Sequence, residues 1–457
     1  MAHNLLIVTD YPAPLQPMPD LESPCDFPTS INLSLPPELL DEVLEIAIGS
    51  FEEDLFGHAN RRTICMEVDF TWASRIKNNP AMWSDIYINN TTHASMAEFS
   101  TCLVNSKGRK LQICLEVEDD FRLLRSSDSR PRLIADFLAE LRPLFSMAMR
   151  QCSCLKLSCM GSGVLDLVLS LVSTLSGGVA TEMRHLQIES YPPQNGVELR
   201  CKFESAFFGH QPLSVYRTAW SFIPCPLASI TVLEIKHLYI DIGVTWMQLK
   251  GTLESATALQ VLHLISVACV VDDLRAEDHP CTLRHLTKLD MVINHPSSDR
   301  IARALRLPRL RTLRLKAPHG WWNQNGVGSM PFLSTVVTVV VDAVEDLDDV
   351  VHKLPRLQRL QIRRAARSKL LQRLDWDKAA EQADCSSALT DIVSEERLSK
   401  EEIASFLHRA SGRIPNKVTL TVPWERWNEV AFVPHCFTEV DGVVVHRATS
   451  VVDLFGA

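Results

Sequence analysis

Three cysteines lie close together in the chain and are the side chains best suited to binding a metal ion. Cys152, Cys154 and Cys159 fall within eight residues, and cysteine thiolates are good zinc ligands. However, they lack the two-residue pair spacing of zinc sites, and no second pair follows. Strand alternation would place Cys152 and Cys154 on one face as small apolar residues. We therefore expect no metal site and no cofactor.

Catalytic motifs are absent from the sequence. It has no Gly-rich phosphate loop ending in Gly-Lys-Ser/Thr, no His-Glu-x-x-His and no Gly-x-Ser-x-Gly. The lone Gly161-Ser162-Gly163 has no second half of a dinucleotide fingerprint and indicates a turn. We assign no catalytic residues and expect a protein that is not an enzyme.

Two adjacent tryptophans are candidate binding residues. Trp321 and Trp322 follow a predicted strand in a Gly-rich segment, and exposed tryptophans often anchor partner proteins. We interpret both as target-binding candidates, with packing onto the core as the alternative. A nearby acidic cluster indicates either a patch for a basic partner or a helix N-terminus: Asp342, Glu345, Asp346, Asp348 and Asp349.

Composition limits the classes of partner. The 457 residues carry a net charge of −9, which disfavours binding to nucleic acid or to an anionic membrane, and the hydrophobic fraction of 46% is typical of globular proteins. The 13 cysteines are scattered rather than arranged as a disulfide framework, and the first residues lack a basic segment before a long apolar run. We expect reduced thiols and a location in the cytoplasm, the nucleus or both.

Two apolar helical patterns occur near the N-terminus. Leu35–Ile48 begins with Pro36 and Pro37, which favour a helix start. Apolar residues then follow at helical spacing: Leu39, Leu40, Val43, Leu44, Ile46 and Ala47. In the second pattern a helix carries Val68, Trp72, Ala73 and Ile76, and it stops at Asn79 and Pro80 before Trp83. The segment 49–60 between them reads as a long connection.

In its order and spacing this arrangement resembles the F-box, a small helical module, in the form carried by fungal proteins. The resemblance covers about residues 32–88, and it departs from the family pattern at Asp69, Phe70 and Thr71. It implies binding to a Skp-type adaptor of a cullin ubiquitin ligase. The residues that it assigns to docking or to the module's core are Leu35, Pro36, Leu39, Leu40, Val43, Ile46, Val68, Trp72, Ala73 and Trp83.

The rest of the chain repeats a short pattern, apolar-x-x-Leu-x-apolar, which is typical of leucine-rich repeats. Seven segments match it: CSCLKL (Leu155, Leu157), MRHLQI (Leu186, Ile188), ITVLEI (Leu233, Ile235), LQVLHL (Leu262, Leu264), LTKLDM (Leu289, Met291), LRTLRL (Leu313, Leu315) and LQRLQI (Leu360, Ile362). Two gaps of 47 residues suggest further strands at PLSVYR (Leu213, Val215) and TVVTVVV (Val339, Val341). LQICLEV (Leu111–Val117) is the expected first strand and KVTLTV (Val418–Val422) a late one.

Helical spacing between these strands, as in Ala135–Arg150 and Trp246–Ala258, completes the predicted architecture. We expect an α/β fold: a Pro-rich disordered leader at 1–31, a helical F-box-like module at 32–90, and an irregular leucine-rich-repeat solenoid with a parallel sheet at 91–457. A charged segment at 363–402 reads as a flexible insertion, and 430–457 as a cap on the last strand. The alternative is an unrelated α/β domain with buried apolar strands.

The resemblance implies a substrate-recognition subunit of a cullin-type ubiquitin ligase, in which the module binds the adaptor and the repeats bind an unknown target protein. The alternative is a repeat scaffold or binding protein without attachment to a ligase.

Overall fold

The computed structural model describes residues 36–48, 55–89, 94–117, 130–160, 162–175, 182–191, 213–223, 227–270, 279–318, 321, 329–341, 354–363, 389–394, 418–423, 437–440 and 443–448. The described helices are α1 (Pro37–Ile48), α2 (Leu55–Val68), α3 (Phe70–Asn78), η1 (Pro80–Trp83), α4 (Ala94–Asn105), α5 (Arg130–Met149), α6 (Ser162–Leu175), η3 (Ile240–Ile242), α7 (Trp246–Ser255), α8 (Pro296–Ala304) and η5 (Pro331–Thr335). The predicted leader lies outside the described residues.

Most described strands form one parallel sheet in chain order. They are β1 (Asp85–Asn89), β2 (Leu111–Val117), β3 (Cys152–Met160), β4 (His185–Tyr191), β5 (Val215–Ala219), β6 (Val232–Leu238), β7 (Val261–Val267), β9 (Lys288–Val292), β11 (Thr312–Lys316), β12 (Thr338–Val341), β13 (Arg359–Ile362), β14 (Asp391–Ser394), β15 (Val418–Pro423), β17 (Val443–Ala448) and β16 (Phe437–Val440). Only β16 runs antiparallel, at the far edge beside β17. A separate pair joins β8 (Cys281–Thr282) to β10 (Leu305–Arg306).

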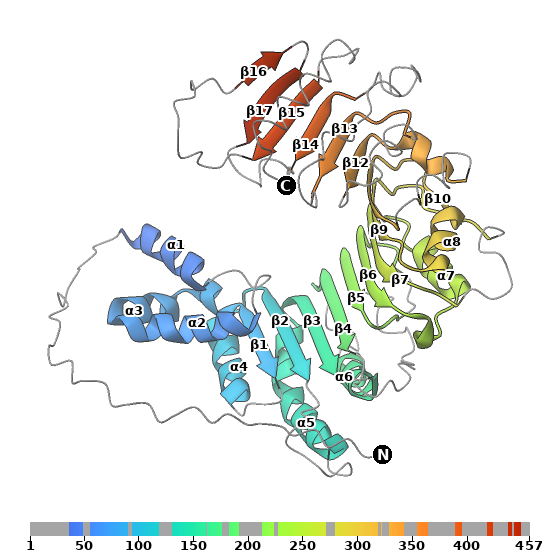
Figure 1. The fold of residues 1–457 in the computed structure, drawn as a ribbon. Coiled ribbons are helices and arrows are strands. Elements are labelled where there is room, and N and C mark those ends of the chain that lie inside the picture. Colours follow the sequence, from blue (N-terminus) through green and yellow to red (C-terminus); the bar gives the residue numbers. More distant parts are fainter. Residues whose placement is uncertain are drawn as a thin grey trace, which may run out of the picture.

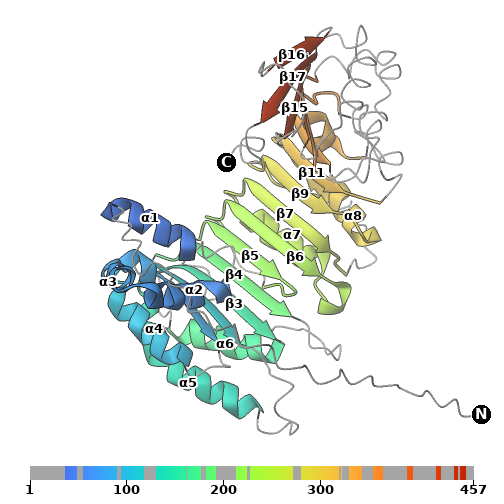
Figure 2. The same cartoon turned by 60° about the vertical axis from the view of Figure 1, so that its left-hand side comes forward.

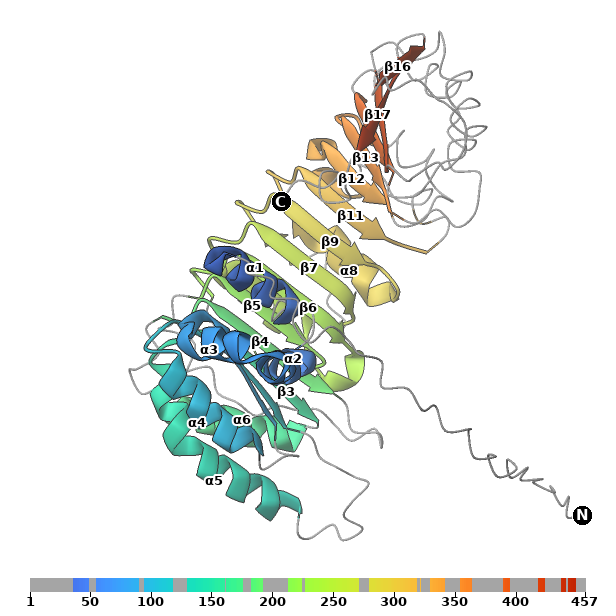
Figure 3. The same ribbon diagram turned by 90° about the vertical axis from the view of Figure 1, so that its left-hand side faces the viewer.

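The sheet curves along its length, with α1–α3 at the β1 end (Figure 1). Helices α4–α8 all lie on the same face of the sheet (Figures 2 and 3). None of the described helices is long and apolar enough to cross a membrane. The chain is therefore an α/β protein with a solenoid-like parallel sheet.

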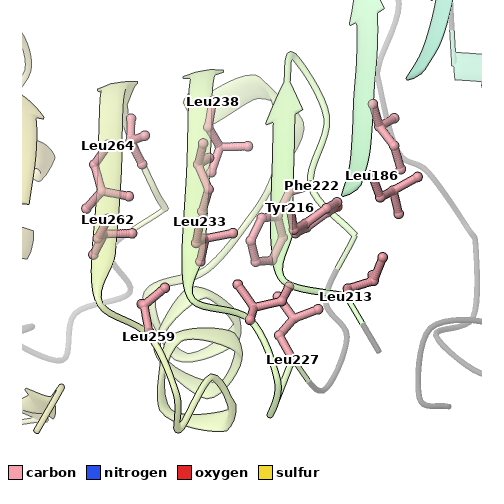
Figure 4. Close-up of a cluster of buried hydrophobic side chains, with 14 of the residues drawn as sticks. Leu186, Leu213, Tyr216, Phe222, Leu227, Leu233, Leu238, Leu259, Leu262 and Leu264 are labelled. Atoms are coloured by element: carbon pink, nitrogen blue, oxygen red, sulfur yellow. The ribbon is translucent and has the colours of Figure 1, made fainter. Parts of the chain in front are cut away.

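One row of inward side chains runs across thirteen neighbouring strands and is buried throughout. Strand pairing aligns its members, each at most 1% exposed: Ile86, Ile113, Leu155, Leu186, Tyr216, Leu233, Leu262, Leu289, Leu313, Val339, Leu360, Ile392 and Leu420. Figure 4 shows the part of this row from Leu186 to Leu262. Because parallel strands in register place equivalent side chains side by side, each repeat covers the next.

A tight turn precedes many of these strands and explains why the repeats stack evenly. In it a backbone N–H donates to the carbonyl three residues earlier, as from Ile230 to Leu227 (3.0 Å) and from Leu357 to Leu354 (3.1 Å). Both residues of each turn are buried. The repeating unit therefore extends one buried turn before the pattern predicted from the sequence.

The seven predicted strands, the strand at TVVTVVV and the late strand at KVTLTV are confirmed, as are the helices at Ala135–Arg150 and Trp246–Ala258. Three expectations are corrected. The sheet begins at β1, one strand before Leu111–Val117. In β5 the buried residue is Tyr216 rather than Val215, because Tyr216 pairs with Leu186 and Leu233.

The third correction concerns the segment predicted to be a flexible insertion at 363–402. It contains β14, in which Ile392 and Val393 are buried between β13 and β15. Two β-branched residues suffice for a short strand here because paired strands flank it on both sides. Near the C-terminus, β17 and β16 extend the sheet, and β16 is its last strand.

The alternation of buried and partly buried positions in β7 predicts unequal costs for two neighbouring aliphatic residues. Leu264→Ala removes a fully buried side chain and should lower the free energy of unfolding by about 3 kcal/mol. Ile265→Ala, on the opposite face and only partly buried, should cost about 1 kcal/mol or less. Urea denaturation of both variants checks this, and equal costs would contradict the assigned register.

Candidate protein-docking site

Helix α1 has two apolar stripes. Pro37 occupies its first turn, and the N–H of Leu40 donates to the carbonyl of Pro36 at 3.0 Å. The stripe that faces the protein core is Leu40, Leu44 and Ile48. The second stripe is exposed and consists of Leu39 (46%), Val43 (37%) and Ile46 (79%). The first stripe attaches the helix to the core, and the second stripe remains exposed in the described part of the chain.

Helices α2 and α3 also expose apolar side chains. Ile64 is 55% exposed and Val68 61% exposed on α2, and Phe70 at the start of α3 is 87% exposed. We define the docking surface as Leu39, Val43, Ile46, Ile64, Val68 and Phe70. These are six of the thirteen exposed large apolar side chains in the described part of the chain. Such a concentration on three adjoining helices is typical of a protein-binding surface.

The structure corrects the predicted boundaries of these helices. The expected long connection at 49–60 contains the start of α2, and Val68 ends α2 instead of lying on the helix of Trp72. Asp69 causes this break because its carboxylate accepts the N–H of Thr71 at 2.6 Å and caps α3. Asp69, one of the three residues that depart from the F-box pattern, is thus a helix cap. Its hydrogen bonds with Thr71 lower its pKa.

The residues assigned by resemblance separate into three groups. Those on the surface are Pro36, Leu39, Val43, Ile46 and Val68. Those in the core are Leu40 and Trp83, and those partly buried are Trp72 and Ala73. Leu35 lies outside the described residues. Sequence reasoning missed Ile64 and Phe70 as surface residues. Phe70 directly follows the capping residue Asp69, which could have indicated its place at a helix start, whereas no local signal marks Ile64.

A buried arginine joins the docking helices to the sheet. Arg62 of α2 is 2% exposed, and its guanidinium donates to the carbonyl of Met82 at 3.0 Å and pairs with Glu98 of α4. It also lies 4.7 Å above the ring of Trp83. The Trp83 indole N–H donates to the carbonyl of Ile76 at 2.7 Å. One side chain thus connects α2, η1 and α4, and no sequence pattern distinguished it from a surface arginine.

Replacing Arg62 should weaken the attachment of α2 to η1 and α4 and so destabilise the protein. Arg62→Met leaves the Met82 carbonyl without its donor and Glu98 without its cation, so we expect the free energy of unfolding to fall by roughly 2–4 kcal/mol. Lys77→Met on the exposed side of α3 is the matched control and should change stability by less than about 0.5 kcal/mol. Equal stability of the two variants in urea denaturation would contradict the role of Arg62.

Asp85, at the start of β1, lies close enough to Arg62 to feel its charge. Burial raises its pKa from 3.8 to about 6, against smaller opposing effects of Arg62 and of a hydrogen bond with Ser84. A carboxyl with a raised folded pKa stabilises the fold while it is protonated, and this contribution is lost as pH rises through about 6. At pH 8 the folded protein therefore carries the cost of an ionised, mostly buried carboxylate.

Asp85→Asn should consequently stabilise the protein at pH 8, by up to roughly 2 kcal/mol. The advantage should shrink as pH falls from 6 to 4, where Asp85 becomes neutral in the native protein as well. Thermal unfolding of both proteins across this range measures the effect. A variant that gains nothing at pH 8 would show that ionised Asp85 is fully compensated.

Of the two predicted target-binding tryptophans, Trp321 is not an exposed anchor. Trp321 is only 7% exposed, and its indole N–H donates to Asp299 of α8 at 2.8 Å. This hydrogen bond satisfies the polar edge of the ring and holds it against the core. Trp322 and the acidic segment from Asp342 to Asp349 lie outside the described residues.

The cysteine pattern is also corrected. The pairing of β2 with β3 shifts between Leu111 and Gln112, so that Cys152 is buried whereas Cys154 lies on the opposite face with Lys156. Burial raises the pKa of Cys102 to about 11 and that of Cys114 to about 12. None of the cysteines in the described ranges forms a disulfide, and no group of three or more His, Cys, Asp or Glu side chains among the described residues is placed to hold a metal ion. Ser162 and Gly163 begin α6 rather than forming a turn.

Comparison of the chain with models of protein families finds no match, and comparison with curated proteins finds no significant similarity.

Proposed function

We propose that this protein is a non-catalytic substrate-recognition subunit of a cullin-type ubiquitin ligase. Its N-terminal helices bind a Skp-type adaptor in the manner of an F-box, and its sheet, as a leucine-rich-repeat solenoid, binds a target protein. The observation that carries the proposal is the docking surface, which exposes six apolar side chains on α1–α3. The resemblance of residues 32–88 to the F-box supplies the identity of the partner.

The buried contacts that attach the helices of the docking surface to the rest of the protein fit this role. A recognition subunit raises the effective concentration of target lysines near the ubiquitin-carrying enzyme, and this effect depends on a fixed geometry between the two binding sites. Arg62 links α2 to η1 and to α4 through buried contacts with Met82, Trp83 and Glu98, and η1 directly precedes β1. A target held on the sheet would therefore keep a defined position relative to the adaptor.

The apolar residues of the docking surface allow a test that spares the fold. Ile46→Asp combined with Phe70→Asp changes two side chains that are mostly exposed, so the chain should remain folded. Each apolar side chain buried at the contact contributes about 1.5–3 kcal/mol, so the pair should weaken adaptor binding by at least roughly a hundredfold. Isothermal titration of the purified chain with a Skp-type adaptor measures this.

The matched control is Val104→Asp on α4, which places the same charge at a 73% exposed apolar position outside the docking surface. It should bind the adaptor like the unmodified chain. Failure of the folded, unmodified chain to bind would overturn the ligase proposal and favour a repeat scaffold without ligase attachment. Equal loss in the control would show that the contact is not at α1–α3.

A further inference from the structure

Two neighbouring strands contain the same irregularity near their carboxyl ends. Inward residues of a regular strand are two positions apart, but in β6 the step from Ile235 to Leu238 is three, and in β7 the step from Leu264 to Val267 is also three. The extra residues are His237 and Ser266, whose φ angles are 53° and 56°. Each strand thus has one inserted residue in the left-handed conformation.

A third strand has the equivalent feature at the same level of the sheet. Ala219, the last residue of β5, pairs with Lys236, so the following Trp220 stands in the position of His237. Its φ angle is 60°, and its N–H donates to the carbonyl of Lys236 at 3.0 Å. Three consecutive strands therefore turn out of the regular pattern at one level.

This conformation is costly for the residues that adopt it. Glycine or asparagine takes a positive φ easily, whereas a bulky side chain such as that of Trp220 crowds the following carbonyl. Inserted residues of this kind redirect side chains and are enriched next to functional sites. The repeated use of Trp and His where Gly would be easier indicates that the side chains themselves are needed there.

The inserted residues bring three aromatic rings together. The rings of Trp220 and His237 are stacked, with centroids 4.6 Å apart and an interplanar angle of 19°. The ring of Tyr239 lies 5.1 Å from that of Trp220, and Tyr239 is 41% exposed. Burial, and then Lys236, lower the pKa of His237, so the cluster is uncharged at neutral pH. Trp and Tyr are the residues most often found as binding anchors.

Charged side chains on β5 and β6, the strands that lead into Trp220 and His237, indicate what the rings bind. The carboxylate of Glu234 pairs with Arg217 (Nε–Oε2 3.2 Å) and with Lys236 (Nζ–Oε1 2.5 Å). The side chain of Glu234 is only 14% exposed, whereas those of Arg217 and Lys236 are 46% and 41% exposed. Solvent therefore meets two cations and little of the carboxylate. This arrangement attracts an anionic group and disfavours a cationic one.

We infer that Trp220, His237 and Tyr239 form the anchor site for a segment of the target protein that carries an aromatic side chain next to a carboxylate. The aromatic side chain packs on the rings, and the carboxylate faces Arg217 and Lys236. The inference rests on the proposed function in one respect, because it takes the bound protein to be the target of the ligase. The binding itself does not require the adaptor.

Selection from a library of random linear peptides on the full chain tests the site, followed by affinity measurement of the selected peptides. We expect enrichment of peptides with an aromatic residue close to Asp or Glu. Trp220→Gly removes the ring at a position whose φ suits glycine, and it should weaken binding by at least about tenfold. Ser266→Gly makes the same backbone change without removing a ring and should bind like the unmodified chain.

Arg217→Gln provides a second variant that leaves the rings intact, and it should weaken the selected peptides by about fivefold or more. If Trp220→Gly fails to fold, this variant decides the outcome. Enrichment of basic peptides, absence of any selected peptide, or unchanged affinity in Arg217→Gln would overturn the inference. The Ile46→Asp/Phe70→Asp variant should still bind the peptides, so loss of adaptor binding and loss of this site are separate results.

Discussion

The fold depends on one continuous row of buried side chains, aliphatic except for Tyr216, that crosses thirteen parallel strands. Each side chain of the row is covered by its neighbours on the adjoining strands, so no repeat can bury its own core without the next. This dependence fixes the register of the sheet. A slip by one residue would expose Leu262 and bury His263, which pairs with Asp290 on the opposite face. The curved, polar face is therefore a consequence of the row.

Helices α1–α3, which carry the docking surface, pack against the β1 end of the sheet and continue its core beyond the first strand. Trp83 and Arg62 connect them to the end of the row, since Trp83 precedes β1 and Arg62 reaches across to α4. The core of the helices and the core of the sheet consequently form one continuous cluster. The second apolar stripe of α1, with Ile64 and Val68 on α2 and Phe70 on α3, remains exposed in the described structure. The adaptor binding that we propose would thus use the exposed faces of helices whose opposite faces stabilise the fold.

Much of the sheet was predictable because its pattern is local. Features set by contacts with other segments of the chain were not predictable. The Leu-x-apolar motif identifies strands such as LQVLHL, since alternation alone decides which residues face inward. Val215 and Cys154 were misplaced because an offset start and a shifted pairing change the face without changing the composition. Trp321 is held by the carboxylate of Asp299, which lies 22 residues earlier in the sequence, and Arg62 is buried by contacts with other segments of the chain. The apolar residues of α1 were recognisable, but which of them face outward depends on the packing of α2 and α3.

We propose that α1–α3 bind the adaptor while the sheet remains free to bind a target. Hydrogen exchange of the purified chain with and without a Skp-type adaptor tests it most directly, because protection reports which backbone segments become buried or stabilised. We expect slower exchange in α1, α2 and the start of α3, and unchanged exchange in β5–β9. Protection confined to the sheet, or none at all in the presence of a saturating adaptor, would contradict it.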